Sequence, residues 1–339
     1  MLKRALTSSK TGPVLVIVLL TAILTVSAGS HVDARSGLTV NNFLNSYTLI
    51  QTATDASFFA IMAVGATIVI ISGGIDLSVG SIYALAGVAT AMALRHTGAG
   101  GSAGTVLFAL ALSVGIGLAC GVANGALVVG LGVHPFIITL GTMWMLRGIA
   151  FVSSRAESIL VPPALTAAAK ASLGLGDALY PVPMLVMLIV AIAGAVYLGV
   201  TVSGRQVFAV GGNAEASRFA GVPIGRVKIT VFLISGVTAG LAAFLGASFY
   251  GSASCADATG YELYVIASAV VGGASLSGGK GSAISALLGA LLIVLIRQSI
   301  RTLHFDQNYE WIIIGCAIII AVVLDQASAR VGTALRRSR

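Results

Sequence analysis

The chain has 339 residues, of which 57% are hydrophobic and only 9% are charged, and its mean hydropathy is +1.02. An average soluble domain carries about 25% charged residues, so this composition excludes an ordinary water-soluble protein. The net charge of +8 does not indicate nucleic-acid binding, because the basic residues follow the membrane pattern described below. We therefore expect an all-α polytopic membrane protein with a single transmembrane domain over residues 1–339.

Long apolar segments follow one another along the chain. A membrane-spanning helix needs about 20 mostly apolar residues, and we predict ten such helices from these segments. The segment near 261–272 is short for a full crossing, and the first span could instead be a cleaved signal segment. The spans are expected at about 13–29, 51–71, 80–95, 105–130, 135–153, 181–201, 229–250, 261–272, 282–303 and 309–326.

Lysine and arginine residues are distributed unevenly over the predicted loops. If the N-terminus lies in the cytoplasm, twelve of the 19 basic residues fall in cytoplasmic segments, and Arg147 and Arg297 lie within spans. Basic residues favour the cytoplasmic side of a membrane, so both termini are expected inside. Five basic residues are expected on the outer side, namely Arg35, Arg95, Arg155, Lys170 and Arg301.

A turn broken by glycine occurs in each half of the chain. Both copies read Gly-Gly-x-x-Leu-Ser and lead into a helix rich in small residues. Paired backbone breaks in two halves of a membrane protein indicate a transporter. Because the turns lie an even number of spans apart, we expect a parallel repeat that relates about 50–150 to 228–326. The residues that we single out are Gly73, Gly74, Asp76, Ser78 and Gly80 in the first turn, and Gly273, Gly278, Gly279 and Lys280 in the second.

Four polar or aromatic side chains in the fourth and fifth spans are candidates for a substrate path. Polar groups inside spans are scarce and often functional, and a face lined by hydroxyl groups would suit a neutral solute such as a sugar. The alternative for the threonines and the asparagine is hydrogen bonding between helices. Arg147, near the outer end, could extend its charge to the membrane surface. The candidates are Asn124, Thr139, Thr142 and Trp144.

The sequence contains no pattern typical of an enzyme or a metal site. The four histidines and three cysteines lack the spacing of metal ligands. The segment around Lys280 resembles a phosphate-binding loop but lacks the required glycine and the hydroxyl residue after the lysine. Asp76 is expected to cap its turn rather than carry protons, since no relay of acidic groups accompanies it. We therefore expect a transport subunit that binds no cofactor and no metal and has no catalytic activity of its own.

The longest predicted cytoplasmic loop, 202–228, contains the signals of a short surface helix. Asn213 is a good N-cap, Glu215 suits the first turn, and Arg218 suits the last. Gly221 and the following proline end the helix. A short, capped and partly apolar helix is suited to dock on another protein, although a plain solvated connector is the alternative. The residues assigned to this coupling loop are Gly211, Gly212, Asn213, Glu215, Arg218 and Gly221.

Two stretches of small residues are expected to pack helices together within one chain. Gly117, Gly121 and Gly125 form a double GxxxG pattern on one span, and Gly236 with Gly240 forms another. Such faces allow two helix backbones to approach closely. We expect internal packing here rather than an interface between subunits.

Taken together, these motifs resemble the membrane-spanning permease subunits of bacterial ATP-binding-cassette importers for ribose and related sugars. The resemblance covers about 50–326, nearly the whole chain. Trp144 departs from the expected pattern and leaves ribose itself open as the solute. The stretches that carry the resemblance are 61–65 with 72–81, 121–125 with 139–142, 204–216, and 260–263 with 278–281.

The resemblance implies partners that composition cannot reveal. It implies a second permease subunit, a periplasmic sugar-binding protein, and a cytoplasmic ATPase that docks on the loop around Asn213, all at the bacterial inner membrane. The family also includes permeases for autoinducer-2, nucleosides and branched-chain amino acids. A self-sufficient secondary carrier is the alternative from another class, and it would transport without these partners.

Overall fold

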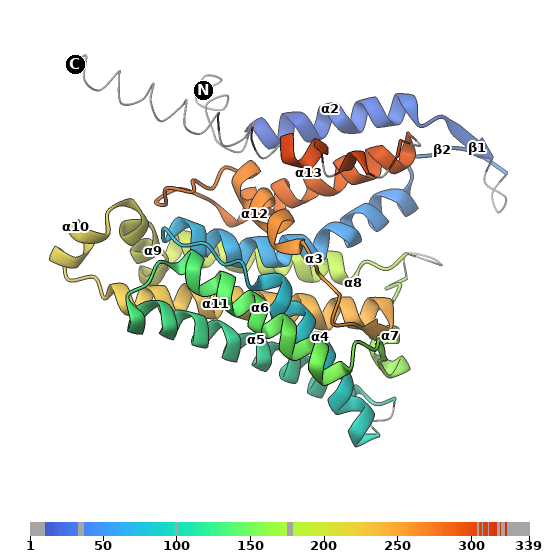
Figure 1. Cartoon of the computed structure of the whole chain (residues 1–339). Helices are drawn as coiled ribbons and strands as arrows, with labels where there is room; N and C mark the ends of the chain where they lie inside the picture. Colours follow the sequence, from blue (N-terminus) through green and yellow to red (C-terminus); the bar gives the residue numbers. More distant parts are fainter. Residues whose placement is uncertain are drawn as a thin grey trace, which may run out of the picture.

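The computed structural model describes residues 11–32, 37–98, 101–174, 179–303, 305–306, 308–310, 312–316, 319 and 323. Over these residues the chain is mainly helical, and the long helices lie side by side in one bundle (Figure 1). Among the described residues, six helices are long and apolar enough to cross a membrane. They are α3 (Ser46–Ile71), α5 (Ala103–Leu131), α6 (Pro135–Ser154), α8 (Val182–Val200), α11 (Ile224–Tyr250) and α13 (Ala283–Thr302).

Three further helices coincide with predicted spans without meeting the same criteria. α2 (Thr11–Ser27) and α12 (Tyr261–Val271) are apolar but short, and α4 (Val79–Thr97) is less apolar than the six. Half of the tenth predicted span, near 309–326, falls outside the described residues. The expected count of ten crossings is therefore supported only in part. The remaining elements are α7 (Pro163–Ala169), α9 (Val202–Gly212), α10 (Ala214–Phe219), the antiparallel pair β1 (Ser30–Val32) and β2 (Thr39–Asn41), and the antiparallel pair β3 (Ile159–Leu160) and β4 (Ser252–Ala253).

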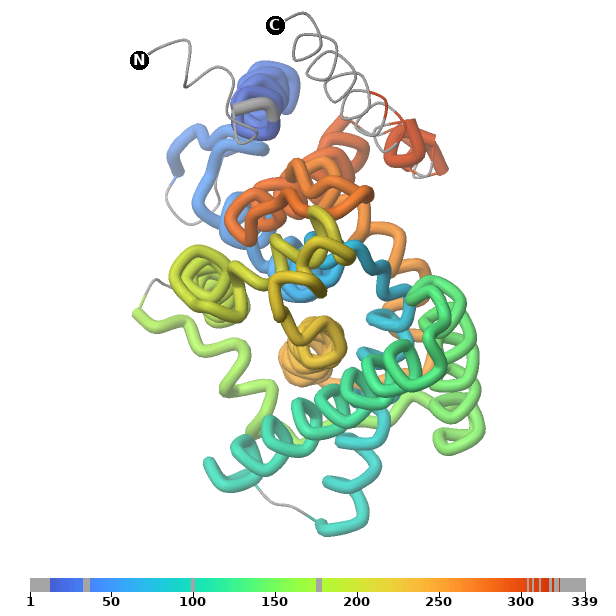
Figure 2. The backbone as a smooth tube through the Cα atoms, turned by 90° about the vertical axis from the view of Figure 1, so that its left-hand side faces the viewer, coloured from blue at the N-terminus to red at the C-terminus, as the bar shows by residue number. Residues whose placement is uncertain are grey.

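The central helix of the bundle is α3. All residues from 56 to 72 are buried, and the helix packs against α8, α11, α12 and α13, which surround it in Figure 2. A helix that is apolar around its whole circumference is stable only when neighbours enclose it. α3 begins at Ser46 rather than near 51, because the Asn45 side chain caps it by accepting a hydrogen bond from the Thr48 N–H.

Three helices on the outside of the bundle leave most of their apolar surface uncovered. Only 22% of the most apolar window of α5 and of α6 is buried, and only 28% of that of α8. Their exposed side chains are mainly Leu, Ile, Val and Phe. These faces would meet lipid or another protein chain in a membrane.

The two glycine stretches pack within one chain, as expected, and the structure shows that they pack α5 against α11. A Cβ atom at Gly117 would overlap the Gly236 carbonyl oxygen, and a Cβ atom at Gly236 would overlap the Gly117 carbonyl oxygen. The Ser113 hydroxyl also donates a 2.8 Å hydrogen bond to the Gly240 carbonyl oxygen. The two backbones therefore touch directly within one chain.

The bundle has two different ends. α9, α10 and both glycine turns lie at one end, on the left of Figure 1, which we call the glycine-turn end. The β1–β2 pair and α7 lie at the other, which we call the hairpin end. Both α3 and α12 run towards the glycine-turn end, and α4 and α13 run away from it (Figure 1).

Candidate functional site

The first glycine turn closes the end of α3. Gly73 adopts a φ of +79°, a left-handed conformation that favours glycine. Its N–H donates a 2.9 Å hydrogen bond to the Ile70 carbonyl oxygen, and the Gly74 N–H donates one of 3.1 Å to Val69. This pair of bonds is the Schellman arrangement that satisfies the last carbonyl groups of a helix.

The second glycine turn closes α12 in the same way. Gly273 adopts a φ of +94°. Its N–H donates a 2.8 Å hydrogen bond to Val270, and the Ala274 N–H donates one of 2.9 Å to Ala269. Gly273 is therefore the counterpart of Gly73. The Gly-Gly pairs of the two motifs are thus out of register by one residue, because the left-handed position is the first glycine in one turn and the second glycine in the other.

The two turns and the end of α9 meet through backbone atoms. The Gly279 N–H donates a 2.8 Å hydrogen bond to the Ile71 carbonyl oxygen, which joins the second turn to the first. A Cβ atom at Gly211 would overlap that same carbonyl oxygen and lie 2.7 Å from the Gly279 nitrogen. A Cβ atom at Gly278 would lie 2.6 Å from the Gly211 carbonyl oxygen. We call these contacts the backbone junction. Lys280 is exposed beside it.

Asp76 lies buried in the first turn and anchors it. One carboxylate oxygen accepts hydrogen bonds from the Ser78 N–H (3.0 Å) and the Ser78 hydroxyl (2.6 Å). The other oxygen accepts a 2.8 Å bond from the Ser235 hydroxyl on α11. The Asn124 side-chain amide of α5 donates a 2.7 Å bond to the Ser78 hydroxyl. These bonds tie the first turn to α11, and the structural role of Asp76 stays a prediction.

The other candidates for the substrate path are divided, because Thr139 and Thr142 are buried neighbours on α6 and Trp144 is exposed. The Thr139 hydroxyl donates to the Ile75 carbonyl oxygen at 3.1 Å, and the Thr142 hydroxyl donates to Thr139. Trp144 is 70% exposed on the outside of α6. The hydrogen bonds of Asn124 and Thr139 connect helices to the first turn, as the alternative interpretation expects. Their part in a substrate path stays a prediction.

Gly80 and Arg147 fix the chain between α11 and α12. A Cβ atom at Gly80 would lie 2.6 Å from the Ala258 carbonyl oxygen. The Arg147 guanidinium donates hydrogen bonds to this same chain segment. Burial raises the pKa of the Asp257 carboxyl in the segment, and a hydrogen bond from the Ser254 N–H opposes that effect. The acceptors of Arg147 are the carbonyl oxygens of Cys255 (2.8 Å), Asp257 (2.6 Å) and Ala258 (3.3 Å).

The short helix predicted in loop 202–228 is confirmed as α10. The Asn213 side chain caps it by accepting a 2.9 Å hydrogen bond from the Ala216 N–H. Gly221 follows it with a φ of +78°. Glu215 and Arg218 are exposed, and Phe219 is 84% exposed. A capped helix that presents two charges and an aromatic ring to solvent is suited to contact another protein.

The helix α9, which precedes α10, is missing from the sequence prediction. The Thr201 side chain caps it by accepting a 2.9 Å hydrogen bond from the Gly204 N–H. Val207 and Val210, three residues apart, are buried against the bundle. The cap and this spacing are the signals that could have revealed the helix. α9 carries Gly211 to the backbone junction, and a Cβ atom at the neighbouring Gly212 would meet open space.

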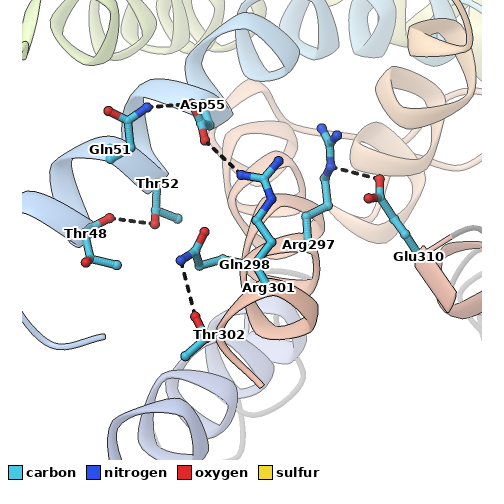
Figure 3. A network of polar contacts seen from close by, with 9 residues as sticks. All are labelled: Thr48, Gln51, Thr52, Asp55, Arg297, Gln298, Arg301, Thr302 and Glu310. Atoms are coloured by element: carbon cyan, nitrogen blue, oxygen red, sulfur yellow. Dashed lines mark hydrogen bonds and ion pairs between the residues drawn. The ribbon is translucent and has the colours of Figure 1, made fainter. Parts of the chain in front are cut away.

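A polar pocket of about 310 Å³ lies between α3, α11, α12 and α13. It lies at the hairpin half of these helices, since it involves the first turns of α3 and the last turns of α13. Phe58, Phe59, Tyr250 and Tyr261 form its aromatic part. Its polar part comprises Gln51, Asp55, Arg297, Gln298 and Arg301 (Figure 3).

Two ion pairs organise the polar part of the pocket (Figure 3). The Arg297 Nε atom lies 2.8 Å from Glu310 Oε1, and its guanidinium also lies 5.5 Å from the ring centres of Phe59 and Tyr264. Arg301 Nη1 lies 3.8 Å from Asp55 Oδ2. The second distance exceeds the 2.7–2.9 Å of a charge-assisted hydrogen bond.

None of the pocket residues belongs to the candidate sites derived from the sequence. Gln51 stands at the start of the predicted span 51–71, and Arg301 is assigned there to an outer loop. Such end positions suggest contact with water or lipid head groups rather than a site. The spacing of these residues in the sequence could have indicated the pocket. Gln51 and Asp55 are four residues apart and share a helix face, and so do Arg297 and Arg301.

The chain matches a known family over most of its length. The family described as branched-chain amino acid transport system / permease component matches residues 48–322. The chain belongs to this permease family. Its described helices and their apolar outer faces agree with a multi-pass membrane protein.

Several curated relatives are similar along nearly their whole length. The ribose import permease protein of Escherichia coli (strain K12) is 35% identical over 90% of this chain and 92% of its own. The D-allose transport system permease protein of the same strain is 36% identical over 84% and 85%. An autoinducer 2 import system permease protein of Photorhabdus laumondii is 30% identical over 85% of each chain. No solved structure matches the chain.

Proposed function

We propose that this chain is the membrane-spanning permease subunit of an ATP-binding-cassette importer for a monosaccharide, either ribose or a related pentose or hexose. The family membership and the similarity to ribose and allose permeases support it. The structural observation that carries the proposal is the exposed helix α10, which is joined through α9 to both glycine turns.

In this proposal a separate ATPase subunit docks on α10 and supplies the energy. The chain itself would bind no nucleotide and catalyse no reaction. ATP binding and hydrolysis would move α10 and α9, and Gly211 would transmit that movement to the backbone junction. Movement of both turns at once would follow from their shared hydrogen bond between Gly279 and Ile71.

The proposed assembly lies in the bacterial inner membrane, with the glycine-turn end in the cytoplasm. Both termini of the chain would be cytoplasmic, and ten spans would cross the membrane in a single domain with a parallel internal repeat. The matching Schellman turns at Gly73 and Gly273, at the same end of the bundle, support the repeat. A second permease subunit, identical or homologous, would complete the path, and a periplasmic binding protein would deliver the sugar.

Two alternatives make different predictions. The relative named for autoinducer 2 import makes another small polar solute the second candidate. A secondary carrier would instead work without partners, driven by an ion gradient.

The deciding experiment is sugar uptake into vesicles that contain the purified permease. We expect uptake of a pentose or hexose only when the ATPase subunit, the binding protein and ATP are all present. Uptake by the permease alone under an ion gradient would establish the carrier instead. A panel of pentoses, hexoses and autoinducer 2 would identify the solute.

A further inference from the structure

We infer that the pocket between α3 and α13 is a sugar-binding site within the permease itself, selective for neutral solutes that carry several hydroxyl groups. The inference rests on the proposed transport function and adds a site to it. It assigns direct solute contact to Asp55, Arg301, Gln51 and Gln298, with Tyr250 and Tyr261 as the apolar wall.

The first argument is the presence of these groups in apolar helices. Ionisable side chains within membrane helices are costly and usually mark a solute path. Asp55 lies in α3, otherwise the most deeply buried helix of the bundle, and its side chain still keeps 25% exposure. The Arg301 side chain keeps 51%. The helices therefore hold a wet polar site where apolar packing would be the simpler arrangement.

The second argument is the geometry of Asp55 and Arg301. At 3.8 Å the two groups are close enough to attract but too far apart for a direct charge-assisted hydrogen bond. A solute hydroxyl can donate to the carboxylate while it, or a neighbouring hydroxyl, accepts from the guanidinium. The Gln51 amide already donates a 3.0 Å bond to Asp55, which holds the carboxylate in place.

The third argument is the balance of charge. Arg297 is paired with Glu310 at 2.8 Å, and Arg301 faces Asp55, so two positive and two negative groups occupy the region. An anionic solute would be repelled by Asp55, and a cationic solute would be repelled by Arg301. In both cases the pocket has no unpaired opposite charge to offset the repulsion. A neutral polyhydroxylated solute can satisfy both groups without disturbing either pair.

The fourth argument is size and the nature of the walls. A volume of about 310 Å³ lies at the lower end of the usual 300–1,000 Å³ range of ligand pockets, which suits a monosaccharide rather than a longer chain. Tyr250 is 59% exposed and tilted against Phe58 at 5.7 Å between ring centres. Exposed aromatic rings offer an apolar surface with a polar edge, which suits the C–H faces of a sugar ring.

The test measures binding to the permease alone, in lipid nanodiscs, by saturation-transfer difference NMR. Ribose and allose are the neutral probes, and ribose 5-phosphate and glucosamine are the charged ones. We expect binding of a neutral probe and at least about tenfold weaker binding of both charged probes. We expect Asp55→Ala and Arg301→Ala to weaken neutral-sugar binding at least about tenfold, since each removes a hydrogen bond to a charged group.

Matched controls separate the site from the fold. Glu157→Gln and Arg155→Gln alter exposed charges on the segment that follows α6, outside the pocket, and should leave binding unchanged. If Asp55→Ala or Arg301→Ala fails to elute as folded protein, Gln298→Ala and Asp55→Asn replace it, and each should still weaken binding.

The outcomes distinguish this inference from the transport proposal. Unchanged binding in folded pocket variants would overturn the inference, as would tighter binding of ribose 5-phosphate than of ribose. ATP-driven uptake together with no detectable sugar binding to the permease would overturn the pocket site alone. Failure of uptake with all partners present, while neutral sugar still binds, would overturn only the proposed importer.

Discussion

Individual residues at the first glycine turn form hydrogen bonds both within the turn and to a distant helix. Asp76 accepts three bonds, two from Ser78 and one from Ser235 on a distant helix. An asparagine could keep the acceptor towards Ser78, whereas an alanine would leave buried donors without partners. The two substitutions therefore distinguish a structural carboxylate from one that carries protons.

We expect Asp76→Asn to retain most ATP-driven uptake and Asp76→Ala to destabilise the protein by about 1–3 kcal/mol for each buried donor left unpaired. Thermal unfolding of the purified variants and vesicle uptake measure the two effects. Loss of uptake in a fully stable Asp76→Asn protein would contradict the structural role and favour proton transfer.

The residues that sequence reasoning identifies share one property, which is that their signal is local. Asn213 and Gly221 are recognised because a cap acts within three residues of its helix. Asp55 and Arg301 are missed because they meet only after α3 and α13 pack together, far apart in the sequence. Each stands near the end of a predicted span, where the sequence alone gives a polar side chain an ordinary explanation.

Among the elements, α9 connects the surface helix α10 to the interior. Its last turn contains Gly211, where the absence of a side chain lets the backbone approach Ile71 and Gly279. The α-helices of the bundle follow from apolar segments, whereas α9 is amphipathic and short and therefore escapes a search for spans. The one-residue offset between the two Gly-Gly pairs also escapes prediction. The sequence motif does not reveal which glycine of each pair takes the left-handed conformation.

We expect Gly211→Ala to disrupt the backbone junction, because the added methyl group would overlap the Ile71 carbonyl oxygen. Forcing extra atoms into such contacts typically costs about 1–3 kcal/mol, and uptake should fall at least about tenfold. Gly212→Ala is the matched control, since its Cβ atom would meet open space. Equal uptake by the two variants would show that the junction does not transmit movement.

We expect Phe219→Ala to lose ATPase binding while the permease still folds, because the ring is 84% exposed and supports no internal packing. Co-purification with the ATPase subunit measures the loss, and Glu215→Ala and Arg218→Ala should reduce uptake in the same way. Leu160→Ala, 79% exposed at the hairpin end, is the control. Undiminished co-purification in all three α10 variants would refute docking at this helix.

In the whole molecule, the two ends of the bundle differ in the features that they hold. The glycine-turn end holds α10 and the backbone junction, and the hairpin end holds the polar pocket. The composition suffices to predict the class of the fold, because few other arrangements bury so many apolar residues with so few charges. The number of crossings depends on α4 and α12, whose length or polarity is marginal when each helix is considered without its neighbours.

Cysteine labelling from each side of the membrane tests the orientation. In a variant without Cys120, Cys255 and Cys316, we expect Leu160→Cys to react with a membrane-impermeant maleimide from outside. Phe219→Cys should react only in inside-out vesicles. The reverse pattern would invert the proposed topology, and labelling of both positions from one side would require an even number of crossings between them.

The glycine contacts between α5 and α11 restrict how the transporter can move. Helices that meet through side chains can slide, because the side chains change rotamers as they pass one another. Gly117 and Gly236 have none, and a slip of one residue would press Ile116 or Leu118 of α5 onto a bare backbone. The pair therefore forms a rigid frame, and we expect α5 and α11 to move as one unit in any alternation between two states.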